Sequence, residues 1–265
     1  MPELPEVVTV MRALKKKVVG QTIKDIDVFY NPMMADEIKQ KLIGQTILNM
    51  DNFGKYLIFH LSDYVLISHL RMEGKYYFKE NLTYGKHDHI IFHLDDHKLI
   101  YNDVRKFGTF DLRTHENYLT IPPLKNLGKE PFDADVDEVY RLMKKRNVYV
   151  KTLLLDQTIM SGIGNIYANE ILFLSKIHPM KKGVNLTKKD VKKLIDSSIK
   201  VLNDSIEKGG SSIHTFTANE VEGWYQLELL VHTKEGVPCK VCGNEIKREM
   251  LQGRSIYYCP VCQRR

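Results

Sequence analysis

The sequence has no run of about 18 apolar residues, so we expect no membrane-spanning helix. It also lacks the basic start and the apolar stretch of a secretory signal peptide, which argues against secretion. We find no internal repeat, and 43% of the residues are hydrophobic, close to the globular average. These features exclude disordered and collagen-like proteins and favour a cytoplasmic globular protein with enough apolar material for a core.

Cysteine is missing from residues 1–238. The four cysteines form two Cys-x-x-Cys pairs, Cys239 with Cys242 and Cys259 with Cys262. The two-residue gap lets both thiolates of a pair face one ion, and two pairs complete a closed tetrahedron that suits Zn²⁺. We predict one structural zinc ion, because so short a segment cannot build an apolar core of its own. Two disulfides or free thiols are the alternative.

Neither sign of charge is in large excess, since 39 Lys and Arg face 33 Asp and Glu for a net charge of +6. This balance fits an anionic partner such as nucleic acid, although many ordinary surfaces carry as much charge. The surplus concentrates in residues 239–265, which hold six basic and two acidic side chains. A rigid basic hairpin can contact phosphates, whereas a solvated basic tail is the plainer interpretation.

Hydrophobic periodicity in the first half of the chain predicts one long helix followed by many short strands. The helix begins near Pro5, which suits a first helical turn, and ends at Gly20. A brief second helix is predicted over residues 36–43. Short strands separated by turns favour antiparallel sheets in a sandwich or barrel. The predicted strands cover residues 23–28, 46–50, 56–60, 65–69, 76–78, 89–94, 99–101 and 109–112.

The pattern changes at residues 114–136, where prolines, a glycine and acidic residues predict a linker. Beyond it the period becomes helical, and residues 211–230 have a loop-like composition. The predicted helices cover residues 137–146, 165–175 and 187–207. The predicted domains, apart from the linker, are residues 1–113, 137–230 and the cysteine-bearing hairpin 231–265.

The first residues are a second candidate for chemistry. Removal of Met1 would leave Pro2 with a free secondary amine. An α-amine with a pKa of about 8 is far less protonated at neutral pH than a lysine at about 10.4, so it can attack an aldehyde-like carbon and form an iminium ion. Glu3 and Glu6 lie close in the sequence and could shuttle protons. The alternative is that these residues only begin the first helix.

Several further segments carry distinctive residues, and each alone is a weak signal. In chain order they are Pro2–Val7, Gly54–Leu57, His69–Gly74, Lys86–His89, Asp103–Gly108, Gly162–Glu170, the two cysteine pairs and Gly253–Ser255. Their joint occurrence in this order is specific. Over nearly its whole length the chain resembles the formamidopyrimidine-DNA glycosylases.

The resemblance implies an α+β fold. An N-terminal helix and a two-layered antiparallel β-sandwich precede a helical helix–two-turns–helix domain with a zinc hairpin, and DNA lies across the cleft between the domains. It also implies a monomeric bacterial base-excision-repair enzyme that acts on double-stranded DNA in the cytoplasm, at the nucleoid. Family members excise oxidised purines, such as 8-oxoguanine and formamidopyrimidines, and then cut the strand at the abasic site.

The resemblance also implies roles for five residues. The Pro2 nitrogen attacks C1′ of the damaged nucleotide and forms an iminium ion. Glu3 is the general acid/base at the sugar, and Glu6 supports it. Lys55 is linked to β-elimination and Arg254 to δ-elimination, where a cation stabilises each departing phosphate.

Further residues are implied as DNA contacts. Extrusion of the damaged nucleotide leaves a gap in the duplex, which three side chains fill as a plug, a donor to the orphaned cytosine and a wedge. These three are Met72, Arg105 and Phe107. Without the resemblance, the plug and the wedge are ordinary core candidates. The predicted contacts to the DNA backbone are His69, His87, Arg146, Lys151 and Asn165.

Four departures from the family pattern bear on lesion preference and DNA affinity. Val8 stands where the family usually has Glu, His214 where it has a basic residue, and His232 where it has Tyr. Residues 217–226, which close over the extruded base in relatives, also differ. The nucleophile is unaffected.

Two other functions stay open. An endonuclease VIII-like enzyme would share the chemistry but prefer oxidised pyrimidines; Leu4 and the three gap-filling residues favour the purine enzyme. A non-catalytic protein that binds damaged DNA through its zinc hairpin is the alternative from another class, and the intact catalytic residues argue against it.

Overall fold

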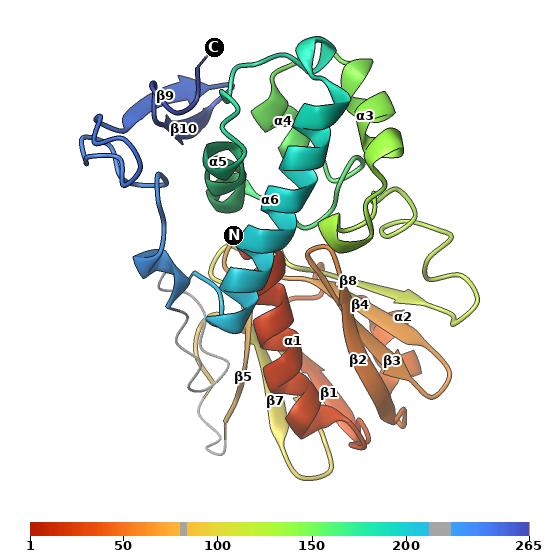
Figure 1. Ribbon diagram of the computed structural model, residues 1–265. Helices are drawn as coiled ribbons and strands as arrows, with labels where there is room; N and C mark the ends of the chain where they lie inside the picture. The colour runs from red at the N-terminus through yellow and green to blue at the C-terminus, as the bar shows by residue number, and fades with distance from the viewer. Residues whose placement is uncertain (80–83, 212–223, 265) are drawn as a thin grey trace. The chain divides into compact units, whose positions relative to one another are not determined.

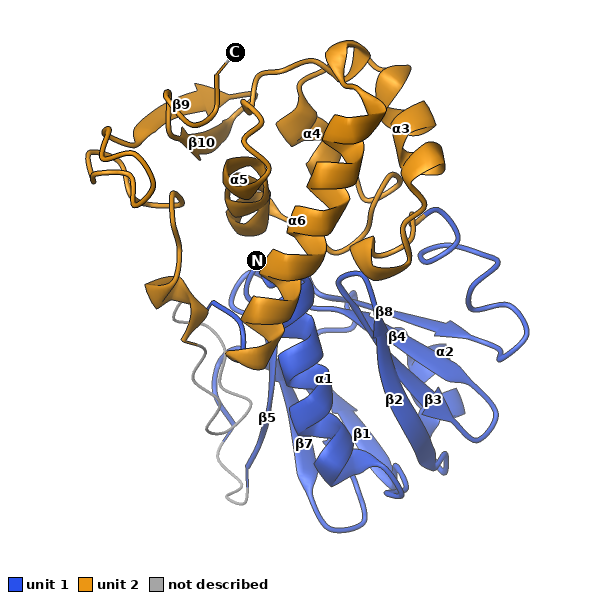
Figure 2. Ribbon diagram, in the orientation of Figure 1, with its two compact units in different colours: residues 1–126, 209–223 blue, residues 127–208, 224–265 orange. Residues whose placement is uncertain are grey.

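The computed structural model describes residues 1–79, 84–211 and 224–264 (Figure 1). The chain divides into two compact units (Figure 2). Unit 1 contains residues 1–126 and 209–223, and unit 2 contains residues 127–208 and 224–265. Among the described residues, no helix is both long and apolar enough to cross a bilayer.

The described residues of unit 1 form two helices and two four-stranded antiparallel sheets. The helices α1 (Leu4–Val18) and α2 (Asp36–Leu42) lie where the sequence predicts them. The strand order is β1-β6-β7-β5 in the first sheet and β2-β3-β4-β8 in the second. The strands are β1 (Asp25–Val28), β2 (Ile47–Phe53), β3 (Tyr56–Leu61), β4 (Val65–His69), β5 (Lys75–Phe78), β6 (Asp88–His93), β7 (Lys98–Asn102) and β8 (Thr109–Arg113).

One apolar core joins α1 to both sheets, which confirms the predicted two-layered sandwich. It combines Leu14 of α1 with Phe59 of the second sheet and Tyr101 of the first, all nearly inaccessible to solvent. Helix α1 is favoured locally as well, because Glu6 lies in its first turn and lysines occupy its last, complementing the helix dipole. The buried face of α1 therefore fixes the helix against the sandwich.

Unit 2 consists of helices and a terminal hairpin. Helix α5 is buried from Ile166 to Phe173, which fits its mostly apolar circumference, and it packs against α4, α6 and β10. The elements are α3 (Val136–Lys144), α4 (Val150–Leu155), α5 (Asn165–Leu174), α6 (Lys188–Glu207), β9 (Lys247–Leu251) and β10 (Arg254–Tyr258). Single 3₁₀ turns cover Pro131–Asp133, Gly183–Asn185 and Tyr225–Leu227.

The α+β class predicted from the sequence is confirmed. Helix α6 begins with a capping box, in which the Thr187 side chain accepts from the Asp190 N–H, and this explains its sharp predicted start. Helix α4 was not predicted, because a six-residue helix is too short for a periodic signal and depends on tertiary packing.

Candidate functional site

Three strands of the second sheet end side by side. Tyr56 of β3 pairs with His69 of β4, and His69 pairs with Thr109 of β8. The turn Gly54-Lys55 joins β2 to β3 just beyond this row. Gly54 has φ = +57°, in the left-handed region that a two-residue hairpin turn requires.

The strands of the first sheet end in a matching row. Lys75 of β5 and Asp88 of β6 both pair with Asn102 of β7. Segment 70–74 runs from β4 to β5 and segment 103–108 runs from β7 to β8, so each connects one row with the other. We call the edge formed by these two segments and the β2–β3 turn the turn edge.

Helix α1 brings the N-terminus to the turn edge. The Gly20 N–H, after α1, donates to the Ile47 carbonyl at the start of β2 (2.8 Å). Lys15 Nζ, earlier in α1, lies 4.0 Å from Asp51 Oδ1, later in β2. Helix α1 therefore runs opposite to β2, and its first residues lie where β2 enters its turn.

The Glu6 carboxylate holds the first residues of α1 in place by hydrogen bonds. Pro2 and Glu3 are both buried. Glu6 Oε2 accepts a hydrogen bond from the Glu3 N–H (2.8 Å), and Glu6 Oε1 accepts from the N–H (2.8 Å) and the hydroxyl (3.0 Å) of Ser211. A Cβ on Gly210 would lie 2.9 Å from Glu6 Oε1, and its φ of +87° also favours glycine. One carboxylate thus ties the start of α1 to the segment that follows α6.

Two basic side chains are buried at the turn edge, Lys55 (6% exposed) and His69 (7% exposed). Burial, followed by the charges of Arg71 and Lys55, lowers the pKa of His69 to about 3. Its ring is therefore neutral at physiological pH, and Nδ1 accepts the Arg71 N–H (2.8 Å). The remaining ring N–H can donate to a phosphate oxygen without adding a charge.

The segments 70–74 and 103–108 present apolar side chains to solvent. Met72 is 39% and Phe107 51% exposed, and the Arg105 guanidinium lies 4.7 Å from the centre of the Phe107 ring. Asp103, which the sequence analysis placed in a motif without giving it a role, is fully buried beneath them. Its carboxylate accepts the backbone N–H groups of Arg105 (3.0 Å), Phe107 (2.8 Å) and Gly108 (2.8 Å). Arg105 and Phe107 therefore belong to one rigid turn.

The other positions singled out in unit 1 are placed as follows. His87 is half-buried just before β6, and its carbonyl accepts the Asp103 N–H (3.0 Å). Val8 is buried on α1, with 8% of its surface exposed. His214, together with residues 217–223 of the segment that closes over the base in relatives, lies outside the described residues.

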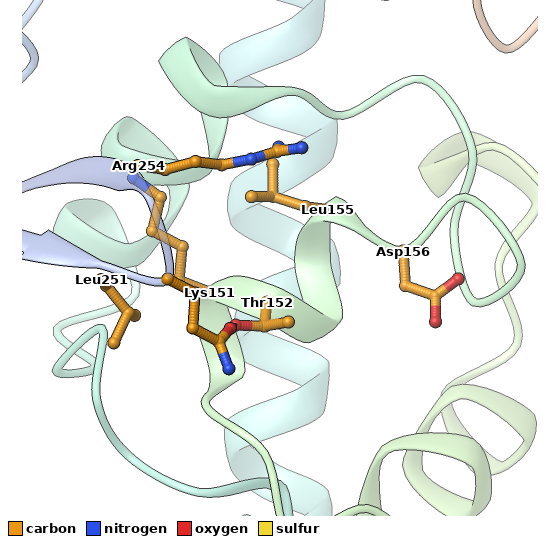
Figure 3. A pocket seen from close by; sticks show the side chains of 7 residues that line it. Lys151, Thr152, Leu155, Asp156, Leu251 and Arg254 are labelled. Carbon is orange, nitrogen blue, oxygen red and sulfur yellow. The ribbon is translucent and has the colours of Figure 1, made fainter.

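A pocket of about 360 Å³ in unit 2 contains two of the predicted site residues, Lys151 of α4 and Arg254 of β10. Side chains from α4 and from the turn between β9 and β10 converge on it (Figure 3). Thr152 donates to Gln252 Oε1 (2.7 Å) across the pocket. The pocket is lined by Lys151, Thr152, Leu155, Asp156, Leu251, Gln252 and Arg254. Arg146, a third predicted residue, is paired with the carboxylate of Asp156.

The side chain of Asn169, in α5, is the centre of a buried network that the sequence analysis missed. Its Oδ1 accepts from Lys151 Nζ (2.6 Å), and its Nδ2 donates to His232 Nδ1 (2.7 Å). Lys151 Nζ also donates to the Ser255 carbonyl of β10 (2.7 Å). Only 1% of Lys151 is exposed, so its ammonium group fastens α4 and α5 to the hairpin beside the pocket.

Glu170, the next residue of α5, holds the chain that leads into the hairpin. Its carboxylate accepts the backbone N–H groups of Leu230 (2.8 Å), Val231 (3.1 Å) and His232 (2.8 Å). Burial raises the pKa of Glu170, although these three donors act in the opposite direction. The Ala-Asn-Glu run after the glycine turn was the available signal for both residues.

Asn165 begins α5 directly after the glycine turn, as predicted. Its side-chain oxygen is buried and has no hydrogen-bond partner among the described residues. The first N–H groups of a helix and its dipole favour an anion at this end.

The four cysteine sulfurs lie within 4.8 Å of one another. Cys239 and Cys262 are separated by 3.9 Å, and Cys242 and Cys259 by 3.4 Å. Zn–S bonds of about 2.3 Å require sulfur separations of about 3.8 Å in a tetrahedron, so the geometry fits zinc. The Cys262 N–H points to Cys259 Sγ (3.5 Å), although burial raises the pKa of this thiol. The four cysteines form the site of one structural zinc ion.

Chelation of the zinc should unfold the hairpin, because the ion replaces an apolar core there. We expect one zinc per chain, and we expect its removal to abolish hydrogen-exchange protection of the β9–β10 amides. The amides of β3 and β4 serve as the internal control and should keep their protection. Unchanged protection of β9 and β10 after complete zinc loss would contradict a structural role for the ion.

His232 should make the protein sensitive to mild acid. Burial, followed by the charge of Lys151, lowers its pKa to about 4, whereas an unfolded histidine titrates near 6.5. Between these values the unfolded chain binds the extra proton, so the free energy of unfolding falls by up to about 3 kcal/mol as the pH falls from 6.5 to 4. His232→Gln, which keeps an acceptor for Asn169, should reduce this decrease in urea titrations. Equal pH dependence in both proteins would contradict the assignment.

Comparisons with known proteins place these features in a family. The model of the formamidopyrimidine-DNA glycosylase N-terminal domain matches residues 1–110 and that of the H2TH domain of the same enzymes matches residues 127–217. A zinc finger found in these enzymes and in IleRS matches residues 236–265.

Similar proteins match over their full length. Formamidopyrimidine-DNA glycosylases of Mycoplasma mobile and Lactococcus lactis are 43% and 44% identical and are matched over at least 99% of both chains. A Lactococcus lactis variant solved with DNA that contains Fapy-dG superposes with a TM-score of 0.95, at 43% identity over 100% of both chains. The same enzyme with abasic DNA gives a TM-score of 0.94, at 42% identity over 99% of this chain and 100% of that one. The chain belongs to the formamidopyrimidine-DNA glycosylase family.

Proposed function

We propose that the protein is a bifunctional DNA glycosylase and AP lyase that removes oxidised purines from double-stranded DNA in base excision repair. One observation carries the proposal: a chain with full-length similarity to this family has Pro2, Glu3 and Lys55 together at the turn edge. The relatives solved with damaged DNA support DNA as the partner. We propose a monomer that acts in the bacterial cytoplasm, where this substrate lies.

Base release begins at Pro2. Its nitrogen becomes a nucleophilic secondary amine only after Met1 is removed, and Met1 is 48% exposed. The nitrogen bonds to C1′ of the damaged nucleotide, and the bond from C1′ to the base breaks. Glu3 acts as general acid/base at the sugar, which opens as the iminium ion forms. Glu6 orients Glu3 through the hydrogen bond to its N–H.

Strand cleavage follows from the iminium ion, which acidifies the C2′ hydrogen. Loss of that proton expels the 3′ phosphate by β-elimination, and a second proton loss expels the 5′ phosphate by δ-elimination. Each departing phosphate carries a charge that a cation stabilises. Lys55 serves the first step and Arg254 the second.

Access to C1′ requires extrusion of the nucleotide, which costs a few kcal/mol. Met72 and Phe107 insert into the space left behind, and Arg105 donates to the orphaned cytosine. The phosphates flanking the lesion are held by His69 as a neutral donor and by the residues His87, Arg146, Lys151 and Asn165. In this arrangement phosphate contacts outnumber base contacts, so the affinity for DNA depends on salt.

The domains divide these tasks. We assign catalysis to residues 1–113 and DNA binding to residues 137–230, with residues 114–136 as the linker. Residues 231–265 form the zinc hairpin. Zinc supplies structural cross-linking there, and it holds the β9–β10 turn that carries Arg254.

A second candidate substrate is an oxidised pyrimidine. Lactococcus lactis Fpg has been solved with DNA that contains one, at 42% identity to this chain and a TM-score of 0.93. Rates of base release from duplexes with 8-oxoguanine opposite cytosine and with thymine glycol separate the two substrates. Faster cleavage at thymine glycol would overturn the preference for purines.

Variants at Pro2 and Glu3 test the chemistry. Pro2→Gly should weaken borohydride trapping on 8-oxoguanine duplex, because the secondary amine is lost. Glu3→Gln should slow base release by about 10²–10⁴-fold while DNA affinity stays close to the wild-type value. The control is Glu37→Gln, which replaces an exposed acid on α2. If the wild type forms no covalent adduct, a non-catalytic binder is favoured, and equal base release in Glu3→Gln would refute the role of Glu3.

Arg254→Gln tests the phosphate role of the hairpin. Loss of this cation should lower the slope of log affinity against log salt by about one. It should also increase the fraction of β-elimination product relative to δ-elimination product on sequencing gels. Arg141→Gln, an exposed cation of α3 outside the pocket, is the control. An unchanged slope with an unchanged product ratio would remove Arg254 from the site.

A further inference from the structure

Tyr101 is a buried residue that the chemistry above does not use. It lies on β7, the strand between β6 and β5, and pairs with Tyr76 on one side and Ile90 on the other. Its ring makes edge contacts with Tyr76 (5.0 Å between centroids) and with Phe110 of the opposite sheet (4.9 Å). Clamped between both sheets, the ring cannot move without disturbing the core.

The Tyr101 hydroxyl points to the base of the turn edge. It lies so close to two glycines that a Cβ on Gly74 would come within 2.2 Å of the oxygen, and a Cβ on Gly108 within 1.8 Å. Neither glycine has a left-handed φ, so backbone conformation does not explain their presence. The space taken by the Tyr101 oxygen explains Gly108, and together with the Leu70 carbonyl, 2.5 Å from the same Cβ, it explains Gly74.

Each of these glycines ends a segment that carries gap-filling side chains. Gly74 closes segment 70–74, where its N–H donates to the Leu70 carbonyl (2.9 Å) and Met72 lies at the tip. Gly108 closes segment 103–108, where its N–H and that of Phe107 share the same Asp103 oxygen. A displacement of Gly108 therefore moves Phe107 with it.

We propose that Tyr101 is a positioning residue that sets the spacing between Met72 on one segment and Arg105 and Phe107 on the other, by seating its hydroxyl between Gly74 and Gly108. The inference rests on the proposed function, because it assigns these side chains to the gap in the duplex. The cost of extruding a nucleotide is highest for an intact pair and lowest for a site that has no base. Mispositioned segments should therefore impair base release more than cleavage at a preformed abasic site.

The first test compares two tyrosines of the same core. Tyr101→Phe removes an oxygen that has no hydrogen-bond partner among the described residues, whereas Tyr76→Phe removes a hydroxyl that donates to Ser68 (2.8 Å) and touches neither glycine. Tyr101→Phe should lower the ratio of 8-oxoguanine release to abasic-site cleavage by about threefold or more, without lowering the melting temperature. Tyr76→Phe should lower the melting temperature and leave the ratio unchanged.

The second test uses suppression. Gly108→Ala places a Cβ against the Tyr101 oxygen and should lower the same ratio by about tenfold or more. Adding Tyr101→Phe removes the oxygen 1.8 Å from this Cβ but leaves Tyr101 Cζ at 2.6 Å, so it should restore only a small part of the loss. Gly74→Ala should not be restored by Tyr101→Phe, since its Cβ would still lie 2.5 Å from the Leu70 carbonyl.

The outcomes separate the inference from the proposed function. If the wild type releases no 8-oxoguanine, the proposed function fails first. If the wild type is active and Tyr101→Phe has the same ratio as both wild type and Tyr76→Phe, the positioning role is overturned. That comparison holds even when Gly108→Ala does not fold. Stronger suppression at Gly74 than at Gly108 would likewise contradict the geometry.

Discussion

The strands of the two sheets end in two matching rows. The pairing register of these strands is the constraint on which the rest of unit 1 depends. Side chains alternate along every strand, so a slip of one residue would turn each side chain to the opposite face of its sheet. The core therefore locks the register, and the register decides where the connecting segments leave the sandwich. Helix α1, packed on the same core, places the chain start beside them. Catalytic and gap-filling residues from distant parts of the sequence meet because their strands end together.

Unit 2 achieves a similar result with buried polar groups. Its hairpin packs only a small apolar cluster against α5, so a zinc ion and the network around Asn169 and Glu170 also hold it against the helices. Such groups are costly unless every donor and acceptor is paired, and Asn169 bonds through both ends of its amide. The buried ammonium of Lys151 fits this logic, since it joins α5 to β10. The position of Arg254 thus depends in part on Asn169 and Glu170, to which the proposed function gives no contact with DNA.

Periodicity and motifs were sufficient to predict much of this from the sequence. Short strands separated by turns, the long helices, the cysteine pairs and the start of α1 have local signals, and the family resemblance pointed to the residues at the turn edge. The roles of Asp103, Asn169, Glu170 and Tyr101 could not be predicted, because they depend on contacts between distant segments. A buried aspartate that accepts three backbone N–H groups looks like any other aspartate in sequence. The six-residue helix α4 was missed because tertiary packing, and no pattern of its own, stabilises it.

The central claim is that the Pro2 nitrogen is the reactive group. The mass of the peptide joined to DNA tests this claim most directly. Borohydride reduction during turnover of an 8-oxoguanine duplex, followed by proteolysis, isolates that peptide. The account predicts a peptide that begins at Pro2, lacks Met1 and carries the sugar remnant on its terminal nitrogen. A linkage to Lys55 or another side chain, or full activity in protein that retains Met1, would contradict it.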